Sequence, residues 1–302
     1  MQAIQFDRFG TTSELHLAEV DVPQVGPDQV RIRVRAAGVN ALDGKIRSGS
    51  MTAITTAFPS IPGFEVAGVV DAIGDGVEDI AVGDEVFGWS STGGYAEYAL
   101  AAVGEIAVKP AELPWEQAVS LPIAGATAER VLDLLEVTAG ETVLLHGAAG
   151  AVGTIAVQLA AARGARVIAT AGQGNQLYLA SLGATATLYG DGLVDRVEQL
   201  APDGVDAVFD LAGKGALEDS ITLRGGTDRI ATIADFRAHE LGITFVSGPT
   251  PRSPRRLAEL ARDAADGSLI TTVTTYPLEQ AAAAQDASDG GHTRGKLALT
   301  IA

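Results

Sequence analysis

A glycine-rich turn between a strand pattern and a helix pattern constrains the fold of this chain more than any other feature. Residues 142–146 form an apolar run typical of a buried strand, and residues 152–162 have the composition of an apolar helix. Between them lies the glycine turn, residues 147–153. Gly150 and Gly153 remove side chains where a phosphate must approach the backbone and where the helix must pack on the strand. Because amide groups and the helix dipole favour a phosphate there, we predict a dinucleotide-binding turn, with a purely structural turn as the alternative.

Strand and helix patterns alternate around this turn. Further strand patterns are found at residues 166–170, 207–210, 229–233 and 243–246, and helix patterns at 124–135, 176–182, 216–223 and 254–265. Such alternation is typical of an α/β fold with a doubly wound parallel sheet, the Rossmann architecture. We predict that residues 122–267 form this dinucleotide-binding domain.

The two ends of the chain have a different character. Residues 30–35 alternate apolar and basic side chains, as in a strand with one wet face, and glycine turns separate further short strand patterns up to about residue 100. Residues 271–276 and 296–301 are again strand-like. We therefore predict a discontinuous β-rich domain formed by residues 1–121 and 268–302.

The segment that follows the second predicted strand of the Rossmann domain bears on the choice of dinucleotide. A carboxylate about 20 residues beyond the glycines would bind the adenosine 2′-hydroxyl of NAD. Residues 170–176 contain no carboxylate and no basic residue. A 2′-phosphate would not be repelled, so we expect NADPH in preference to NADH. Thr170, Gln173 and Asn175 are the candidate neutral donors, and an ordinary polar loop is the alternative.

Composition excludes several other function classes. The chain has no cysteine, which rules out disulfides and thiolate metal ligands, and no two of its four histidines have the i, i+4 spacing of metal ligands. A net charge of −17 disfavours binding to nucleic acid or anionic lipid. No apolar run approaches the ~20 residues that span a bilayer. We expect a cytoplasmic protein with a small-molecule substrate and neither a nucleic-acid nor a membrane partner. A His/carboxylate metal site stays open, although the sequence has no signature of one.

Several segments resemble the medium-chain dehydrogenase/reductase superfamily, and within it the zinc-independent quinone oxidoreductases of the zeta-crystallin-like branch. They are the glycine turn and residues 37–49, 62–70, 83–88, 94–98, 121–128 and 291–296. The resemblance covers almost the whole chain and implies that the β-rich domain is a GroES-like catalytic domain. Zinc-dependent relatives carry an early cysteine and a Gly-His-Glu segment, whereas Phe64 occupies the histidine position here. Loss of these ligands argues against zinc chemistry.

The resemblance also implies roles for individual residues. Asn40 and Asp43 are expected near the nicotinamide or the substrate, and Lys45 could polarise a substrate carbonyl. Loop-tying polar side chains and a solvated lysine are the alternatives. Thr127 and Lys296 are expected to approach the cofactor, unless they are a threonine bonded to its own helix and a surface lysine.

The predicted sites can then be stated in full. The cofactor-binding set is Thr127, Gly147, Ala148, Gly150, Ala151, Val152, Gly153, Thr170, Gln173, Asn175 and Lys296. The catalytic candidates are Asn40, Asp43 and Lys45. Four aromatic residues are expected to line an apolar cleft for a flat conjugated substrate, or else to pack in the core: Phe58, Phe64, Trp89 and Tyr95.

The predicted function is that of an NADPH-dependent, metal-independent reductase that transfers hydride to a quinone or another α,β-unsaturated carbonyl. Two alternatives remain: an enoyl or biosynthetic tailoring reductase on the same scaffold, and a non-catalytic, crystallin-like NADPH-binding protein. Relatives pair the last strand of the cofactor sheet, here residues 243–246, across a twofold axis. The resemblance therefore implies a homodimer.

Overall fold

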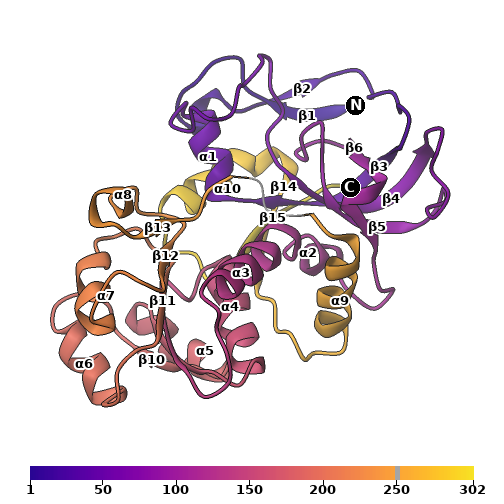
Figure 1. Cartoon of the computed structure of the whole chain (residues 1–302). Helices are drawn as coiled ribbons and strands as arrows, with labels where there is room; N and C mark the ends of the chain where they lie inside the picture. The colour runs from indigo at the N-terminus through magenta and orange to yellow at the C-terminus, as the bar shows by residue number, and fades with distance from the viewer. Residues whose placement is uncertain (249–251) are drawn as a thin grey trace. The chain divides into compact units, whose positions relative to one another are not determined.

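The computed structural model describes residues 1–248 and 252–302, and the chain divides into two compact units (Figure 1). Unit 1 comprises Met1–Ile123 and Arg252–Ala302, and unit 2 comprises Ala124–Pro251. The sequence placed the helix at 254–265 in the Rossmann domain. The structure groups this helix, α9 (Pro254–Ala265), with unit 1, where it packs against β7 (Ile106–Val108) with its apolar residues Leu257, Leu260 and Ala261 buried.

Unit 2 is built on a six-stranded parallel sheet in the order β10-β9-β8-β11-β12-β13. The strands are β8 (Thr142–His146), β9 (Arg166–Thr170), β10 (Thr185–Thr187), β11 (Ala207–Asp210), β12 (Ile230–Thr232) and β13 (Thr244–Phe245). The helices are α3 (Pro122–Leu134), which begins just before the unit boundary, α4 (Ala151–Ala162), α5 (Gln176–Ser181), α6 (Leu193–Leu200), α7 (Leu217–Arg224) and α8 (Ala238–Leu241). As right-handed crossovers require, α4 and α5 lie on one face of the sheet and α6 and α7 on the other (Figure 1).

The register of this sheet brings the carboxyl ends of its strands together. His146 is paired with Thr170 on one side and with Asp210 on the other, and Asp210 is paired with Thr232. Beneath this row the strands bury apolar side chains on both faces, as expected for a sheet covered by helices on both sides. The prediction of a doubly wound α/β unit is confirmed.

Unit 1 contains a seven-stranded sheet that is mostly antiparallel. Its order is β14-β15-β3-β4-β5-β7, with β6 also paired to β3, and only β14 and β15 run parallel. The remaining strands are β3 (Gln29–Val39), β4 (Glu65–Ile73), β5 (Glu85–Trp89), β6 (Tyr98–Ala102), β14 (Val273–Pro277) and β15 (Lys296–Thr300), with a small separate sheet of β1 (Gln2–Gln5) and β2 (His16–Glu19). The helices are α1 (Ala41–Arg47), α2 (Trp115–Ala118), α9 and α10 (Ala281–Asp289). Because β15 pairs with β3, the last strand completes a sheet that the first hundred residues begin.

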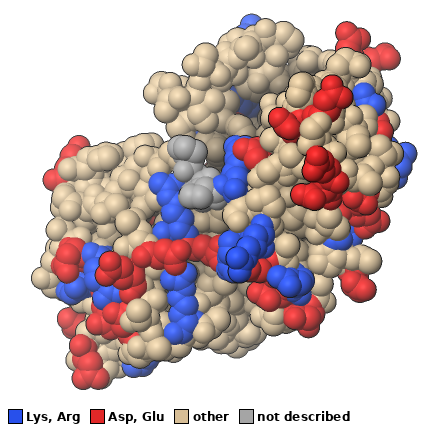
Figure 2. Space-filling model, turned by 45° about the vertical axis from the view of Figure 1, so that its right-hand side comes forward, with Lys and Arg blue, Asp and Glu red and all other residues tan. Residues whose placement is uncertain are grey.

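Several arginine side chains of the described residues pair with carboxylates. Arg163 and Arg229 in unit 2 bond to Asp133 and Glu141, each at 2.6 Å. On the face shown in Figure 2, basic side chains lie beside acidic ones rather than forming a separate basic surface. In residues 1–248 and 252–302, no helix is both long and apolar enough to cross a membrane.

Candidate functional site

The three glycines of the turn in unit 2 differ in whether the fold requires them. Gly147 has φ +68, and a side chain there would also approach Ala212, with Cβ to Cβ at 3.0 Å. A Cβ on Gly153 would lie 2.5 Å from Ala148 Cα, so this glycine lets α4 pack on the turn. A Cβ on Gly150 would meet only the carbonyl oxygen of Gly147, at 3.7 Å. Gly147 and Gly153 are therefore explained by the fold, whereas Gly150 faces open space.

The first turn of α4 offers donors beside this open space. Gly150 precedes the helix, and its carbonyl accepts the first helical bond, from Thr154 N–H at 2.9 Å. The N–H groups of Ala151, Val152 and Gly153 lie ahead of that bond and have no partner inside the helix. Such a terminus fits a phosphate group. Ala148 has a different role, because it is buried and its N–H donates to the carbonyl of Thr170 at 3.1 Å.

Buried polar side chains hold the strand ends beneath the turn. His146 bonds through Nδ1 to Thr170 Oγ1 at 3.3 Å and through Nε2 to Ser220 Oγ at 3.1 Å. Burial lowers the pKa of His146 to about 4, so the ring is neutral at pH 7. Asp210 Oδ1 accepts the Ala212 N–H at 3.0 Å. The Thr170 side chain was predicted to face the cofactor, but it is buried against His146 and acts in this network instead.

The other ribose-end candidates lie on a short 3-10 helix, Gln173–Asn175. Gln173 is exposed and Asn175 is half-buried. Tyr189 is 61% exposed, and its hydroxyl lies 3.7 Å from the position of a Cβ on Gly172. The structure therefore places Tyr189 beside this loop.

In unit 1 the predicted residues Asn40 and Lys296 meet around a carboxylate that the sequence analysis missed. Lys296, the first residue of β15, donates from Nζ to Asn40 Oδ1 at 2.6 Å and also to Glu65 Oε2. Asn40 Nδ2 donates to the same Glu65 oxygen at 2.7 Å. The other Glu65 oxygen accepts the Ile123 N–H at 2.7 Å. Lys296 is therefore a buried side chain held within unit 1.

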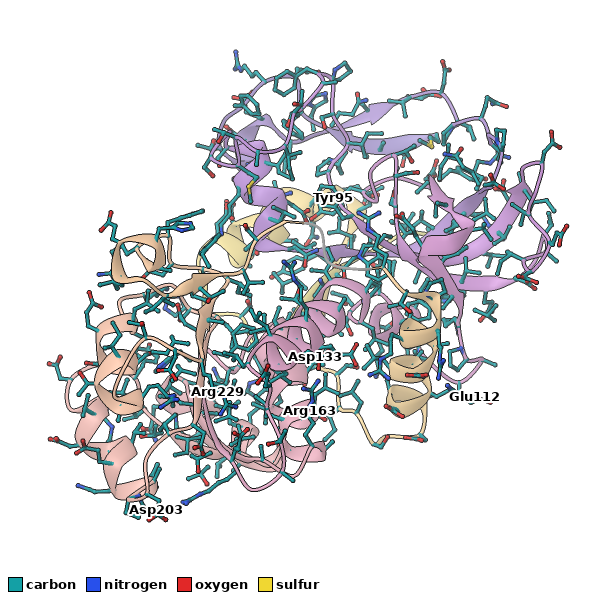
Figure 3. The ribbon with its side chains drawn as sticks, viewed as in Figure 1. Tyr95, Glu112, Asp133, Arg163, Asp203 and Arg229 are labelled. Carbon is teal, nitrogen blue, oxygen red and sulfur yellow. The ribbon has the colours of Figure 1, made fainter. Side chains whose placement is uncertain are left out.

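Asp43 lies on the first turn of α1 and is also buried. Its Oδ2 accepts the Asn40 N–H and the Tyr95 hydroxyl, both at 2.9 Å, and its Oδ1 bonds to no group in the part of the chain that the structure describes. Burial raises the pKa of Asp43 to about 7. Burial and, after it, the neighbouring Asp43 raise the pKa of Tyr95 well above its usual value. Tyr95, labelled in Figure 3, is fully buried and so does not line an open cleft.

The remaining unit 1 candidates differ in accessibility. Lys45 and Phe64 are half-buried. Phe58 is 41% exposed, and its ring meets those of Phe6 and Phe9 edge-on, at 5.7 and 5.0 Å between centroids. Trp89 is buried, with the Arg252 guanidinium 5.7 Å from its ring centre, so it packs in the core.

In unit 2, the remaining candidate Thr127 is half-buried on α3.

A sequence signal for Glu65 existed. It is a carboxylate at the start of an otherwise apolar run, residues 64–70, where a charged side chain needs a partner. Gly38 on the neighbouring strand makes room for it, because a Cβ there would lie 3.1 Å from Glu65 Cβ and closer still to Oε2. The partner could not be inferred, since Lys296 lies 231 positions away in the chain.

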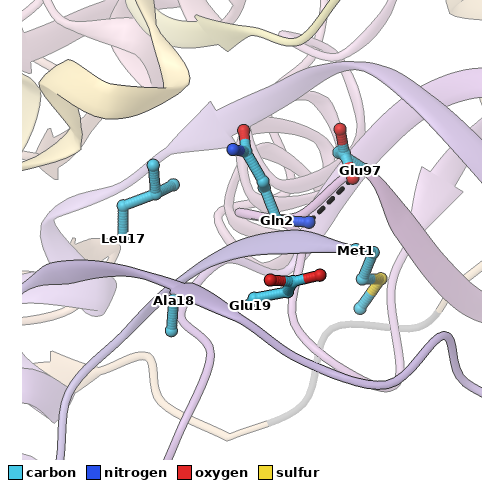
Figure 4. A pocket seen from close by; sticks show the side chains of 6 residues that line it. All are labelled: Met1, Gln2, Leu17, Ala18, Glu19 and Glu97. Carbon is cyan, nitrogen blue, oxygen red and sulfur yellow. Dashed lines mark hydrogen bonds between the residues drawn. The ribbon is translucent and has the colours of Figure 1, made fainter.

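A surface pocket beside β1 and β2 is a separate feature of unit 1 (Figure 4). It is open and is lined by Met1, Gln2, Leu17, Ala18, Glu19 and Glu97. The Gln2 N–H donates to Glu97 Oε2 at 2.7 Å across it. None of the predicted site residues lines this pocket.

Comparison with known proteins gives two family matches. Residues 26–111 match the alcohol dehydrogenase GroES-like domain, and residues 151–240 match the family described as zinc-binding dehydrogenase. The quinone oxidoreductase of Rattus norvegicus is 33% identical over 100% of this chain and 97% of its own length. The NADPH-dependent alkenal/one oxidoreductase of Arabidopsis thaliana is 36% identical over 70% of this chain and 58% of its own. The structure of Escherichia coli quinone oxidoreductase complexed with NADPH has a TM-score of 0.90 and 25% identity, covering both chains fully.

Proposed function

The chain belongs to the quinone oxidoreductases of the medium-chain dehydrogenase/reductase superfamily, and on that premise we propose that it uses NADPH to reduce a quinone or another α,β-unsaturated carbonyl. It is an oxidoreductase, and its full-length likeness to quinone oxidoreductases makes a quinone the first substrate class to test. The likeness to an alkenal/one reductase supports enones as the second.

The observation that carries the proposal is the open space at Gly150. Of the three turn glycines, Gly150 is the one at which an added side chain would be neither strained nor in collision with a protein atom. The N–H groups of Ala151, Val152 and Gly153, which have no partner inside the helix, lie beside it at the positive end of the α4 dipole. This arrangement fits the pyrophosphate of a dinucleotide, whose backbone approach would explain the glycine.

We propose NADPH in preference to NADH because the loop after β9 has no carboxylate to repel a 2′-phosphate. Gln173 and Asn175 would donate hydrogen bonds at this end, and Tyr189 would contact the adenine. When bound, NADPH supplies the hydride.

The protein's own groups would orient the substrate. The half-buried Asn40 amide would donate a hydrogen bond to the substrate oxygen on which negative charge develops, and Lys45 would add positive charge nearby. Hydride adds to an electron-poor atom of the substrate, two electrons move towards the oxygen, and solvent supplies the proton that oxygen takes up. Phe58 and Phe64 are the accessible aromatic candidates for contact with a flat substrate.

We further propose that this reaction needs no zinc. The chain has no cysteine, and Phe64 stands where zinc-dependent relatives have a histidine. Within residues 1–248 and 252–302, no three His, Asp or Glu side chains gather as a metal site would require. Exhaustive dialysis against a chelator should leave turnover unchanged, and loss of activity restored by Zn²⁺ would overturn this part of the proposal.

We also propose a homodimer formed along β13, which is an edge strand of the unit 2 sheet. The rings of Phe245 on this strand and Phe236 stack at 4.8 Å between centroids, and Phe236 is 61% exposed. An open strand edge beside exposed aromatic surface is a typical association site.

The direct test is NADPH consumption with a small quinone and with an enone of matched size. Loss of NADPH absorbance that depends on substrate and protein is the expected result, with a lower KM for NADPH than for NADH. Turnover of the enone alone would favour the enoyl or tailoring reductase. Tight NADPH binding without turnover of either compound would refute the reductase and favour the non-catalytic binding protein.

A further inference from the structure

The side-chain amide of Asn40 is held between two buried charges of opposite sign. Glu65 is 0% exposed and Lys296 is 3% exposed, and the two form an ion pair. Asn40 bonds to both, with Oδ1 accepting from Lys296 at 2.6 Å and Nδ2 donating to Glu65 at 2.7 Å. An amide nitrogen carries two N–H groups, so one N–H is left over on this half-buried residue.

These partners leave the amide only one orientation. The oxygen and nitrogen ends of an asparagine amide have nearly the same shape, so only hydrogen-bond partners decide which way it is turned. An ammonium can only donate and an ionised carboxylate can only accept. A reversed Asn40 would place Nδ2 against Lys296 and Oδ1 against Glu65, which would break both bonds and set like groups against each other.

Stability alone does not account for this pair. Burial of two opposite charges costs desolvation that a well-packed apolar pair would avoid. The backbone has also been adapted to it, because Gly38 lacks the side chain that would collide with Glu65, and the Ile123 N–H satisfies the second carboxylate oxygen.

We propose that Lys296 and Glu65 are positioning residues that fix the Asn40 amide, so that its second N–H is the group donated to the substrate oxygen. This inference rests on the proposed reductase function, and it gives Lys296 a role other than direct contact with the cofactor. A donor fixed in advance needs no reorganisation when negative charge develops on the substrate.

The double variant Glu65→Gln with Lys296→Met tests whether the pair fixes the orientation of the Asn40 amide, without leaving a buried charge unpaired. The glutamine introduced at position 65 can keep its oxygen on the Ile123 N–H, which turns its NH₂ group towards Asn40. With the lysine at position 296 gone, Asn40 is then free to turn its oxygen to that donor, so the orientation of the amide is reversed. We expect kcat to fall about 100-fold, the size of effect seen when one such donor is removed, with the KM for NADPH unchanged.

The matched control neutralises another ion pair of the same unit. Arg31 and Asp71 are bonded at 2.9 Å on β3 and β4, so Arg31→Met with Asp71→Asn removes the same charges away from Asn40. This control should keep kcat within about twofold of the wild type. An equal loss in the control would mean that the effect is general destabilisation, and would overturn the proposal.

A double-mutant cycle decides whether Glu65 and Lys296 act on the reaction through Asn40. Asn40→Ala should lower kcat by a similar factor in the wild type and by little in the double variant. Equal losses in both backgrounds would overturn the proposal.

Amide NMR of the wild-type protein, in which Asn40→Ala identifies the Asn40 resonance, needs neither activity nor a folded double variant. One Asn40 side-chain proton should be shifted downfield and exchange slowly because it bonds to Glu65, while its twin exchanges fast. Two Asn40 side-chain protons that exchange equally fast would contradict a fixed orientation of the amide. A locked amide in a protein that turns over no quinone or enone would instead refute the reductase function and the catalytic use of the amide.

Discussion

Replacement of Gly150 by alanine separates ligand binding from folding more cleanly than any other change in the turn. The new methyl group would meet only Gly147 O, at 3.7 Å, an ordinary van der Waals distance. The backbone at Gly150, with φ −74 and ψ 180, is extended and open to any residue. The folded state is therefore unstrained, and the stiffer unfolded chain should raise stability by about 0.4–1 kcal/mol.

The same methyl group would occupy the space where we place the pyrophosphate. If the methyl group displaces the phosphate from one amide donor, the binding free energy of NADPH falls by about 1.5–3 kcal/mol, the value of a hydrogen bond to a charged group. At about 1.4 kcal/mol for each factor of ten, NADPH should bind roughly 10- to 100-fold more weakly.

Gly153→Ala and Gly147→Ala are the matched comparisons. At Gly153 the methyl group would lie 2.5 Å from backbone atoms of Ala148, and overpacking of this kind costs about 1–3 kcal/mol. At Gly147 the left-handed φ of +68 costs an alanine about 1–2 kcal/mol. Both variants should melt at lower temperature without ligand, whereas Gly150→Ala should not.

The assay pairs thermal melts of the ligand-free variants with NADPH titrations followed by protein fluorescence. Unchanged NADPH affinity in Gly150→Ala would refute the placement of the phosphate at this turn. A drop in melting temperature as large as that of Gly153→Ala would refute the claim that Gly150 is free of structural constraint.

Four further outcomes follow from single contacts. Burial raises the pKa of Asp43 from 3.8 to about 7, so folding favours its protonated form. The free energy of unfolding should be full below pH ~4 and fall by up to roughly 4 kcal/mol as the pH rises through 7. In denaturant titrations, Asp43→Asn should remove this pH dependence. The hydrogen bond from Arg229 lowers the pKa of Glu141 from 4.5 to about 2, so this bond stabilises the fold above pH ~4.5 and the stabilisation is lost as the pH falls towards 2. On acid titration the wild type should lose about 1 kcal/mol of unfolding free energy from this bond, and Glu141→Gln should not. Tyr189→Ala should weaken NADPH binding about 10-fold by loss of stacking, and an unchanged Kd would exclude adenine contact. Phe236→Asp should convert a dimer into single chains in sedimentation, and a wild-type mass of one chain would contradict the dimer itself.

Much of unit 2 could be predicted from local patterns. β8 and β9 begin and end at the predicted residues, and α4 starts one residue early. β10 was missed because it has only three residues, two of them threonines, at the edge of the sheet. α6 was also missed, although Leu193, Val197 and Leu200 have the apolar spacing of a helix face.

Unit 1 was less predictable. Residues 30–35 revealed only part of the eleven-residue strand β3, and the short helix α1 that follows was not predicted at all. That helix carries Asp43 and Lys45, while Asn40 directly precedes it, so the missed element positions the catalytic candidates. Its seven residues include a glycine and two basic side chains, too few and too polar for an apolar period to stand out.

By itself the sequence determined the glycine turn and the sheet around it, because a strand, a turn and a helix form from about twenty consecutive residues whose apolar spacing is local. Tertiary structure alone decided which polar groups are buried and with whom. Asn40, Glu65 and Lys296 meet across separations of 25 to 256 residues. The pKa of Asp43 and the burial of Thr170, Trp89 and Tyr95 depend equally on neighbours from distant segments. Desolvation depends on everything packed around a group, which no local pattern records.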